Sequence, residues 1–143
     1  SQGTRCHQLG LYVVFESPLQ MLADSPSHYQ RQADMMDFLG AVPSVWDETK
    51  VLEARIADYA LVARRNGEEW FVGAITDWEA RELELDLSFL PEGKFVLDEY
   101  RDGVNADRYA EDYVREQRSV TNATKLKLKL AEGGGWAARI RRE

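Results

Sequence analysis

The stretch ELELDLSFL, residues 82–90, decides the fold class of this chain. Apolar and polar side chains alternate strictly along it. The apolar positions are Leu83, Leu85, Leu87 and Phe89, and the polar positions between them are Glu82, Glu84, Asp86 and Ser88. Because successive side chains of a β-strand point to opposite faces, this pattern predicts an antiparallel strand with one face buried and the other in water.

Alternating segments recur on both sides of this stretch. YALVARR at 59–65 and WFVGAIT at 70–76 flank Asn66-Gly67. Asn-Gly is a strong hairpin signal because both central residues of a type I′ turn need positive φ. Downstream, KLKLKLA at 125–131 points three leucines to one side and three lysines to the other, and a run of glycines follows it. These segments predict a set of antiparallel hairpins.

Four further segments complete the β pattern. We expect strands at 50–56, 94–101, 115–121 and 136–142. Together with the segments above they make about eight short strands, joined by turns rich in Gly and Asn. Strands of this length and spacing are typical of a β-sandwich or a barrel. The predicted fold class is therefore mainly β, an antiparallel sandwich of about eight strands that follows an N-terminal helical segment.

The first forty residues have a helical period instead. Between Thr4 and Phe15, the apolar residues Leu9, Tyr12 and Val13 lie on one face of a helix, at spacings of three and four. Further apolar side chains cover much of the remaining circumference. A helix that is apolar nearly all round is typically buried on several sides.

Two Ser-Pro pairs interrupt this helical region. Ser17 fits a helix N-cap with Pro18 at the first helical position, and Ser25 with Pro26 repeats the arrangement. The pattern predicts three consecutive helical pieces, and Gly40 is placed to end the last of them.

The all-round apolar helix calls for a cover that a sandwich does not obviously supply. It resembles the outer helix of an α/β unit, which lies on a sheet. We therefore predict two parts, a helical segment over residues 1–43 and a sandwich over residues 44–143. The helix is expected to pack against a scaffold outside this stretch. Without that scaffold its apolar side needs another cover, either the sandwich or a second copy, and we expect the chain by itself to self-associate or to hold its N-terminus weakly.

Composition limits the classes of partner. Of 143 residues, 25 are Asp or Glu and 18 are Lys or Arg, which gives a net charge of -7. This acidity argues against nucleic acid and against an anionic membrane surface as partners. No apolar run is long enough to span a membrane, and the first residues lack a signal peptide, so either the protein is not exported or the start of a longer protein lies upstream. The lone Cys6 excludes an internal disulfide.

Carboxylates are plentiful, but the sequence places none of them as a catalytic pair. Glu82, Glu84 and Asp86 share one side of a strand and are predicted to form a solvated face. Asp47 and Glu48 are adjacent, so on a strand they point in opposite directions and cannot converge across a cleft. We expect this pair to fix the junction between the helical segment and the first strand.

Metal and cofactor motifs are equally weak. RDGVNAD at 101–107 is rich in oxygen ligands but lacks the spacing of an EF-hand, and we interpret it as a turn. His7 and His28 are the only histidines, and Cys6 is next to His7 on a different helical face, which disfavours zinc. The chain has neither a phosphate-binding glycine loop nor a serine-nucleophile elbow. No cofactor is therefore expected in this chain.

Aromatic side chains are the better candidates for binding. Trp78, Tyr100 and Tyr109 are the predicted carbohydrate-binding residues, because flat aromatic faces stack on sugar rings. Trp78 lies in a predicted turn and is expected to be exposed, although packing or a protein interface is the more common role for such a residue. Trp70 and Trp136 alternate with small residues and are expected in the core.

Four quoted segments together resemble a known family. They are GTRCHQLGLYVVFESPLQMLADSP (3–26), VPSVWDETKVLEARIADYALVARR (42–65), WFVGAITDW (70–78) and YRDGVNADRYAEDY (100–113). They are similar to the C-terminal part of glycoside hydrolase family 97, and the resemblance covers almost the whole chain. The helical block is partly shared with related α-galactosidase families.

The resemblance implies a place for this chain in a larger enzyme. Members of the family have an N-terminal β-sandwich, a catalytic (β/α)8 barrel and a small C-terminal β-sandwich. They act as α-glucosidases or α-galactosidases, with acidic catalytic residues and calcium in the barrel, and are typically exported bacterial proteins. By this resemblance residues 3–23 are the last barrel helix, and no catalytic or calcium-binding residue of the family falls within the chain.

Three functional hypotheses follow. The first is a non-catalytic accessory domain that supports the barrel and contributes to a homo-oligomer. Leu9, Tyr12, Val13 and Leu19 would then face the barrel or a partner copy. The second is a carbohydrate-binding module that holds an oligosaccharide through its exposed aromatics. The third and weakest is an independent enzyme.

Overall fold

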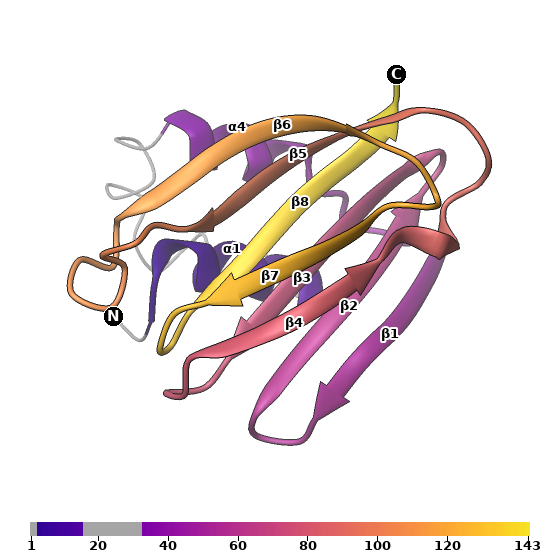
Figure 1. Cartoon of the computed structure of the whole chain (residues 1–143). Coiled ribbons are helices and arrows are strands. Elements are labelled where there is room, and N and C mark those ends of the chain that lie inside the picture. Colours follow the sequence, from indigo (N-terminus) through magenta and orange to yellow (C-terminus); the bar gives the residue numbers. More distant parts are fainter. Residues whose placement is uncertain (1–2, 16–32) are drawn as a thin grey trace.

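The computed structural model describes residues 3–15 and 33–143 (Figure 1). It contains two α-helices, eight strands and one short 3₁₀-helix within these residues. The elements are α1 (Arg5–Val14), α4 (Ala33–Ala41), β1 (Glu48–Arg55), β2 (Tyr59–Asn66), β3 (Glu69–Thr76), β4 (Arg81–Asp86), η1 (Leu87–Phe89), β5 (Phe95–Asp102), β6 (Tyr113–Val120), β7 (Lys125–Leu130) and β8 (Gly135–Arg142). The predicted number of strands is confirmed.

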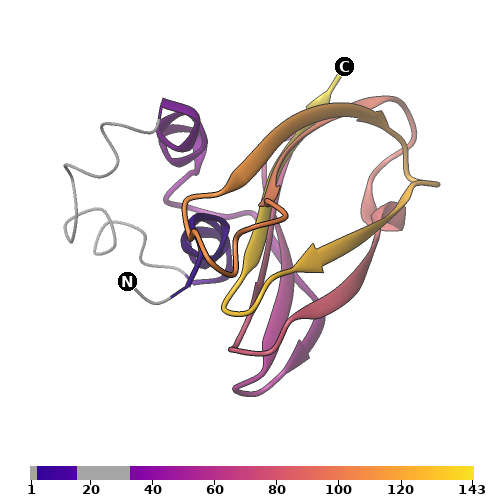
Figure 2. The ribbon, with the colours of Figure 1, turned by 60° about the vertical axis from the view of Figure 1, so that its left-hand side comes forward.

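The strands form two facing antiparallel sheets. The large sheet has six strands in the order β1-β2-β3-β8-β5-β6, and the small sheet consists of β4 and β7. Figure 2 shows the small sheet on one side of the large sheet and both helices on the other side. The predicted β-sandwich with an N-terminal helical segment is confirmed, and the helices add a third layer.

The hairpin between β2 and β3 is confirmed, but its turn is shifted by one residue. Asn66 pairs with Glu69, so the two loop residues are Gly67 and Glu68. Gly67 has φ +61°, whereas Glu68 is not among the residues with positive φ. A glycine at the first central position is typical of a type II′ turn. The expected type I′ turn centred on Asn66-Gly67 is therefore wrong in register.

The small sheet confirms the alternating pattern that opened the sequence. Leu83 of β4 lies opposite Leu128 of β7, and Glu84 lies opposite Lys127. The leucines face the large sheet, while the oppositely charged side chains face water. The strand is shorter than predicted, because the Asp86 side chain accepts a hydrogen bond from the Ser88 amide at 2.9 Å and starts η1.

The space between the two sheets contains the main hydrophobic core. Trp70 and Trp136 are both buried in it, as expected, together with the leucines of the small sheet. The ring of Phe89 lies 4.7 Å from that of Trp70, centroid to centroid. This core is built from residues of the predicted sandwich region alone.

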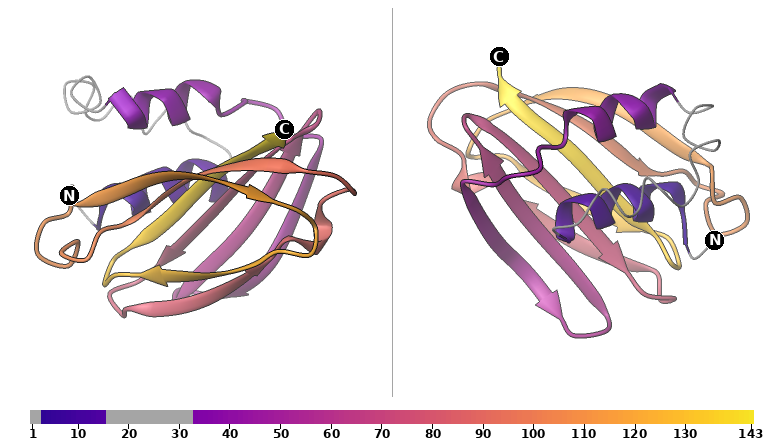
Figure 3. Two further views of the ribbon diagram at one scale, coloured as in Figure 1. Left: turned by 45° about the horizontal axis from the view of Figure 1, so that its top comes forward. Right: turned by 180° about the vertical axis from the view of Figure 1, so that it is seen from behind.

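A second core lies between α1 and the opposite face of the large sheet. Thr4 caps the helix, since its hydroxyl oxygen accepts a hydrogen bond from the His7 amide at 3.1 Å. Figure 3 shows α1 lying across the back of the sheet. The approach is close because glycines meet there. A Cβ on Gly73 would lie 2.7 Å from the Cβ of Val13.

The expected exposure of the helix is wrong for the residues that can be checked. Leu9, Tyr12 and Val13 are 0%, 1% and 0% exposed, packed with Phe71 and Tyr100 of the sheet. The outer face of the sheet is itself apolar at alternate positions, and it covers the helix. Of the covers that the sequence left open for these residues, the structure shows the sandwich. These three side chains are therefore core residues of this chain.

Several expectations lie outside the described residues. Leu19 and both Ser-Pro pairs fall in residues 16–32. The division into residues 1–43 and 44–143 stays a prediction, although α1 shares a core with the sheet. Neither described helix is long and apolar enough to cross a membrane.

A network of charged side chains around Arg115 holds α4 against the second core. Arg115 of β6 forms two hydrogen bonds with the Asp98 carboxylate, at 2.9 and 3.1 Å. The same guanidinium donates to Asp34 at 2.8 Å and to Asp37 at 3.1 Å on α4. The Tyr100 hydroxyl donates to the carbonyl oxygen of Asp34 at 2.8 Å. One arginine thus joins the helix to two neighbouring strands.

Candidate ligand-binding cleft

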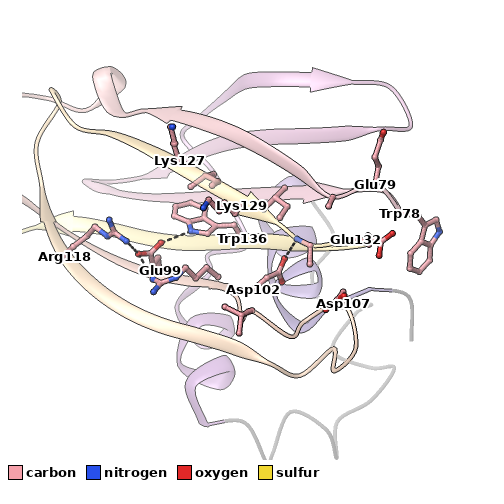
Figure 4. Close-up of a pocket in the computed structure, with 17 residues that line it drawn as sticks. Trp78, Glu79, Glu99, Asp102, Asp107, Arg118, Lys127, Lys129, Glu132 and Trp136 are labelled. Atoms are coloured by element: carbon pink, nitrogen blue, oxygen red, sulfur yellow. Dashed lines mark hydrogen bonds and ion pairs between the residues drawn. The ribbon is translucent and has the colours of Figure 1, made fainter.

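A cleft of about 750 Å³ opens on one side of the sandwich (Figure 4). Its walls come from β5, β6, β7 and β8 and from the loops that follow β3, β5 and β7. The lining residues are Trp78, Glu79, Ala80, Glu99, Arg101, Asp102, Gly103, Val104, Asp107, Arg118, Lys127, Leu128, Lys129, Leu130, Ala131, Glu132 and Trp136. The volume is in the range of small-molecule sites.

The cleft exists because the two sheets differ in width. Within the described part of the chain, β7 pairs only with β4, while β5 and β6 extend the large sheet beyond β8. Side chains of β5 and β6 therefore line a gap that the two-stranded sheet does not cover. A depression of this kind follows from the topology rather than from any single side chain.

A buried carboxylate forms the deep end of the cleft. Glu99 is only 2% exposed, and one of its oxygens accepts a hydrogen bond from the Trp136 indole Nε1 at 2.8 Å. Its other oxygen is bound by Arg118 and, at 3.2 Å, by Arg101. Arg101 also reaches Glu116 at 2.6 Å. Every charge at this end is therefore paired, which fits a rigid base better than a reacting group.

The opposite end of the cleft is formed by Trp78. Its side chain is large and apolar, yet the residue is 65% exposed. The ring lies against the turn that joins β7 and β8, where a Cβ on Gly133 would come within 2.9 Å of its Cζ3 atom. The Gly133 amide donates to the Asp77 carbonyl oxygen at 2.6 Å, which ties the turn to the Trp78 loop. The indole is thus held on one side and open on the other.

Asp102 stabilises the β7–β8 turn that contacts Trp78. One of its carboxylate oxygens accepts hydrogen bonds from the amides of Ala131 at 2.9 Å and Gly135 at 3.1 Å. Burial raises the pKa of this carboxyl above its ordinary value, and the two amide hydrogen bonds oppose that rise. The β7–β8 turn is accordingly fixed at both of its ends.

The predicted carbohydrate-binding residues lie in different places. Trp78 is exposed, as expected, and lines the cleft. Tyr100 is 1% exposed and contacts α4 on the other side of the large sheet, so its assignment as a sugar contact is wrong. Adjacent residues of a strand alternate between faces, and Glu99 takes the cleft side of β5. Tyr109 is 60% exposed but is not among the lining residues.

Sequence reasoning missed the ion cluster that Arg101 and Arg118 form with the buried Glu99 carboxylate. A usable signal was present in the segment FVLDEYR at 95–101. Phe95, Leu97, Glu99 and Arg101 share one face of the strand by alternation, so a carboxylate falls in phase with buried apolar residues. A charged residue in that phase needs a buried partner.

The carboxylates considered as catalytic candidates have structural partners. Asp47 accepts a hydrogen bond from the Gly67 amide at 2.8 Å, and Glu48 forms an ion pair with Arg65 at 3.2 Å, so both fix the helix-to-strand junction as predicted. The 103–112 loop is closed by a hydrogen bond from the Asn105 amide to Asp112 at 2.9 Å. In residues 3–15 and 33–143, no group of three or more metal-ligating side chains is gathered.

A family model matches residues 45–141. The matching family is described as glycosyl-hydrolase 97 C-terminal, oligomerisation. The match covers more than half of the chain.

Curated relatives match the helical segment as well. The chain is 49% identical over 141 residues to a retaining alpha-galactosidase of Bacteroides thetaiotaomicron, a match that covers 99% of this chain and 21% of that protein. It is 34% identical over 131 residues to a probable retaining alpha-galactosidase of Streptomyces bingchenggensis, covering 92% and 20%. The chain therefore spans about a fifth of the curated relatives that it matches.

Solved structures agree with these relatives. A glycoside hydrolase family 97 enzyme from Pseudoalteromonas sp. strain K8 superposes with a TM-score of 0.88 and 36% identity. The match covers 98% of this chain and 23% of that one. A crystal structure of a beta-arabinopyranosidase matches 75% of the chain with a TM-score of 0.57 and 30% identity.

Proposed function

This chain belongs to the glycosyl-hydrolase 97 C-terminal family, and on that basis we propose that it serves a larger α-glycosidase as an accessory domain that mediates self-association. One observation carries the proposal: 99% of the chain aligns with a retaining alpha-galactosidase, yet it accounts for only 21% of that protein. Chemistry is assigned to the part that lies outside the alignment. The resemblance inferred from the sequence is confirmed by the family match.

The whole protein is proposed to hydrolyse α-galactosides, because both curated relatives described above are named as α-galactosidases. A catalytic barrel that binds calcium and export from a bacterial cell belong to the same proposal. The test is an assay of the longer protein with nitrophenyl α-galactoside and α-glucoside. We expect turnover of the galactoside by the longer protein and none by this chain alone.

The helix α1 is proposed to connect the sandwich to the barrel. One side of α1 is buried on the large sheet, whereas Gln8, Leu11 and Val14 are only half-buried. A helix that packs on the sheet with one side can contact barrel helices with the other. In this arrangement α1 still contacts the barrel, as expected, but through its half-buried side and not through the three residues that are buried on the sheet.

The proposed contact between copies is an apolar groove at one end of the large sheet. The groove has a volume of about 410 Å³ and lies between the end of α1 and the β1–β2 hairpin. Phe15 is 57% and Ile56 97% exposed beside it. Exposed apolar side chains gathered at a groove are typical of protein contacts. The occupant we propose is a second copy of this chain, as the description of the family indicates.

The test is the mass of the chain in solution with and without Ile56→Glu. A charge at this position should be costly to bury, so the substitution is expected to shift the chain from dimer or higher oligomer to monomer. Light scattering after size exclusion, over a range of concentrations, measures the effect.

Val104→Glu is the matched control. Val104 is 96% exposed and also branched at Cβ, but it lies in the loop after β5, away from the groove. This variant should retain the mass of the unmodified chain. A monomeric unmodified chain, or equal masses for the two variants, would contradict the proposed contact.

A further inference from the structure

We propose that the cleft between the sheets binds a neutral oligosaccharide, with one sugar ring stacked on the open face of Trp78. This goes beyond the proposed accessory role, because it gives the domain a ligand of its own. The site is the cleft of about 750 Å³ described above, and its ligand class follows from three features of the lining.

The first feature is the fixed and exposed indole. An exposed tryptophan is costly unless its free face is used, because a large apolar area remains in water. Trp78 is 65% exposed, and its ring lies against Gly133, at a position where a Cβ would be 2.9 Å away. A ring that is already held in place loses little conformational entropy when a ligand stacks on it. The apolar C–H face of a pyranose is the complement of such a platform.

The second feature is the distribution of charge. Figure 4 shows Trp78 and Glu132 at one end of the cleft and Arg118 with Glu99 at the other. The charged side chains at the Trp78 end are the carboxylates Glu79, Asp107 and Glu132. The arginines at the other end are already paired with carboxylates. An anionic ligand would be repelled by the three carboxylates, and a cationic one would meet the two arginines. Sugar hydroxyls donate to carboxylates and accept from guanidinium groups, so a neutral polyol fits both ends.

The third feature is a rigid floor. The paired Glu99 carboxylate and the buried Trp136 ring fix the deep end, and Asp102 holds the β7–β8 turn through two amides. Sites that are formed before binding lose less free energy on binding than flexible ones. The volume is large enough for more than one sugar ring, since ligand sites typically measure about 300–1,000 Å³.

The position of the cleft supports the same ligand class, and this step rests on the proposed function. The Thr4 amide, at the start of α1, donates to the Gly133 carbonyl oxygen at 2.9 Å, so Trp78 lies beside the beginning of that helix. In a (β/α)8 barrel each helix starts at the face that carries the active site. If α1 is the last barrel helix, the cleft opens on the side where the enzyme's own substrate arrives.

The experiment is a titration of the 143-residue chain with maltotriose and with an α-galacto-oligosaccharide, followed by amide NMR. We expect saturable shifts confined to the loops around Trp78 and the β7–β8 turn. Trp78→Ala should weaken binding at least about tenfold, roughly 1.4 kcal/mol. Trp78→Phe keeps a smaller aromatic face and should lie between the two.

Tyr109→Ala is the matched control, because Tyr109 is similarly exposed but does not line the cleft. It should bind as the unmodified chain does, and unchanged amide spectra of all variants establish that they fold. The proposal is overturned if neither sugar shifts any cleft amide up to tens of millimolar, because the binding free energy would then be weaker than about -2 kcal/mol. Equal affinity of Trp78→Ala and the unmodified chain also overturns it.

The result separates this inference from the proposed function. Sugar binding is measured on this chain by NMR, whereas the accessory role is measured by mass and by the activity of the longer protein. A chain that self-associates through Ile56 but binds no sugar would leave Trp78 as a protein contact and remove only the present inference.

Discussion

At the scale of single residues, one buried carboxylate, Asp98, depends on an arginine that also binds two exposed carboxylates. Arg115 holds Asp98, Asp34 and Asp37 at once, and its guanidinium lies 5.1 Å from the centroid of the Tyr100 ring. Burial raises the pKa of Asp98, but hydrogen bonds from Arg115 and Gln117 outweigh it and hold that pKa below its usual value. The arginine therefore keeps the Asp98 carboxylate ionised in its buried position.

Replacing this arginine should destabilise the fold. Arg115→Met leaves the buried Asp98 carboxylate without its main partner and releases α4 from β6, which should cost about 2 kcal/mol. Urea denaturation measures the loss. Arg55→Met is the control, because Arg55 forms an exposed ion pair with Asp58 and lies 6.0 Å from the centroid of the Tyr59 ring, contacts that should together be worth less than about 1 kcal/mol. Equal stability of the two variants would show that the network contributes nothing.

We expect His7 to make the free energy of unfolding depend on pH. Burial lowers the pKa of His7 from its ordinary value of 6.5, because the folded chain disfavours the charged imidazole. The contribution of this residue is thus fully present above pH 6.5 and is lost as the pH falls from there through the lower folded pKa.

The expected result is a stability curve with a slope in the acid direction. The free energy of unfolding should decline below about pH 6.5, and His7→Gln, which cannot gain a charge, should flatten that decline. Urea titrations at a series of pH values measure both curves. If the variant declines as steeply as the unmodified chain, His7 is not the source of the slope.

At the scale of elements, the contact between α1 and the large sheet is set by small residues. A Cβ at Gly73 would meet the Val13 Cβ and the Gly10 carbonyl oxygen, at 2.7 and 2.8 Å. Neither atom belongs to a flexible side-chain end, so the helix itself must move. Backbones can approach this closely only where one of them lacks a side chain.

Two glycine-to-alanine substitutions should therefore change the free energy of unfolding in opposite directions. Gly73→Ala is expected to destabilise by about 1–3 kcal/mol, because it forces α1 off the sheet. Gly40→Ala in α4, where a Cβ would meet nothing within 4 Å, should stabilise by about 0.5–1 kcal/mol. Thermal unfolding of both variants measures the difference. A stabilised Gly73→Ala variant would disprove the tight packing of α1.

At the scale of the whole molecule, three layers share one central sheet. The large sheet presents Leu61 and Trp136 to the inter-sheet core and Phe71 and Tyr100 to the helices. The sandwich that we predicted to stand alone is therefore continuous with the helix that we predicted to be uncovered. Among the described residues, the surfaces to which we assign a partner are the outer side of α1, the groove beside Ile56 and the cleft beside Trp78.

The sequence by itself determined the strands, their alternation and the first helix. Each of these depends on neighbours within a few residues, as in the paired patterns of β4 and β7. It also carried the family resemblance, because long stretches of the chain match residue by residue. It identified Trp78 as exposed, since a turn between two strands leaves a large side chain few neighbours.

Only the tertiary structure decided what covers α1 and where a ligand can bind. The cover of Leu9, Tyr12 and Val13 comes from strands more than fifty residues away, and no local pattern says which face of a sheet a helix will meet. The cleft likewise arises from strand order, because a two-stranded sheet faces a six-stranded one. Contacts between distant segments depend on the path of the whole chain, and side-chain periodicity records only the direction in which each residue points.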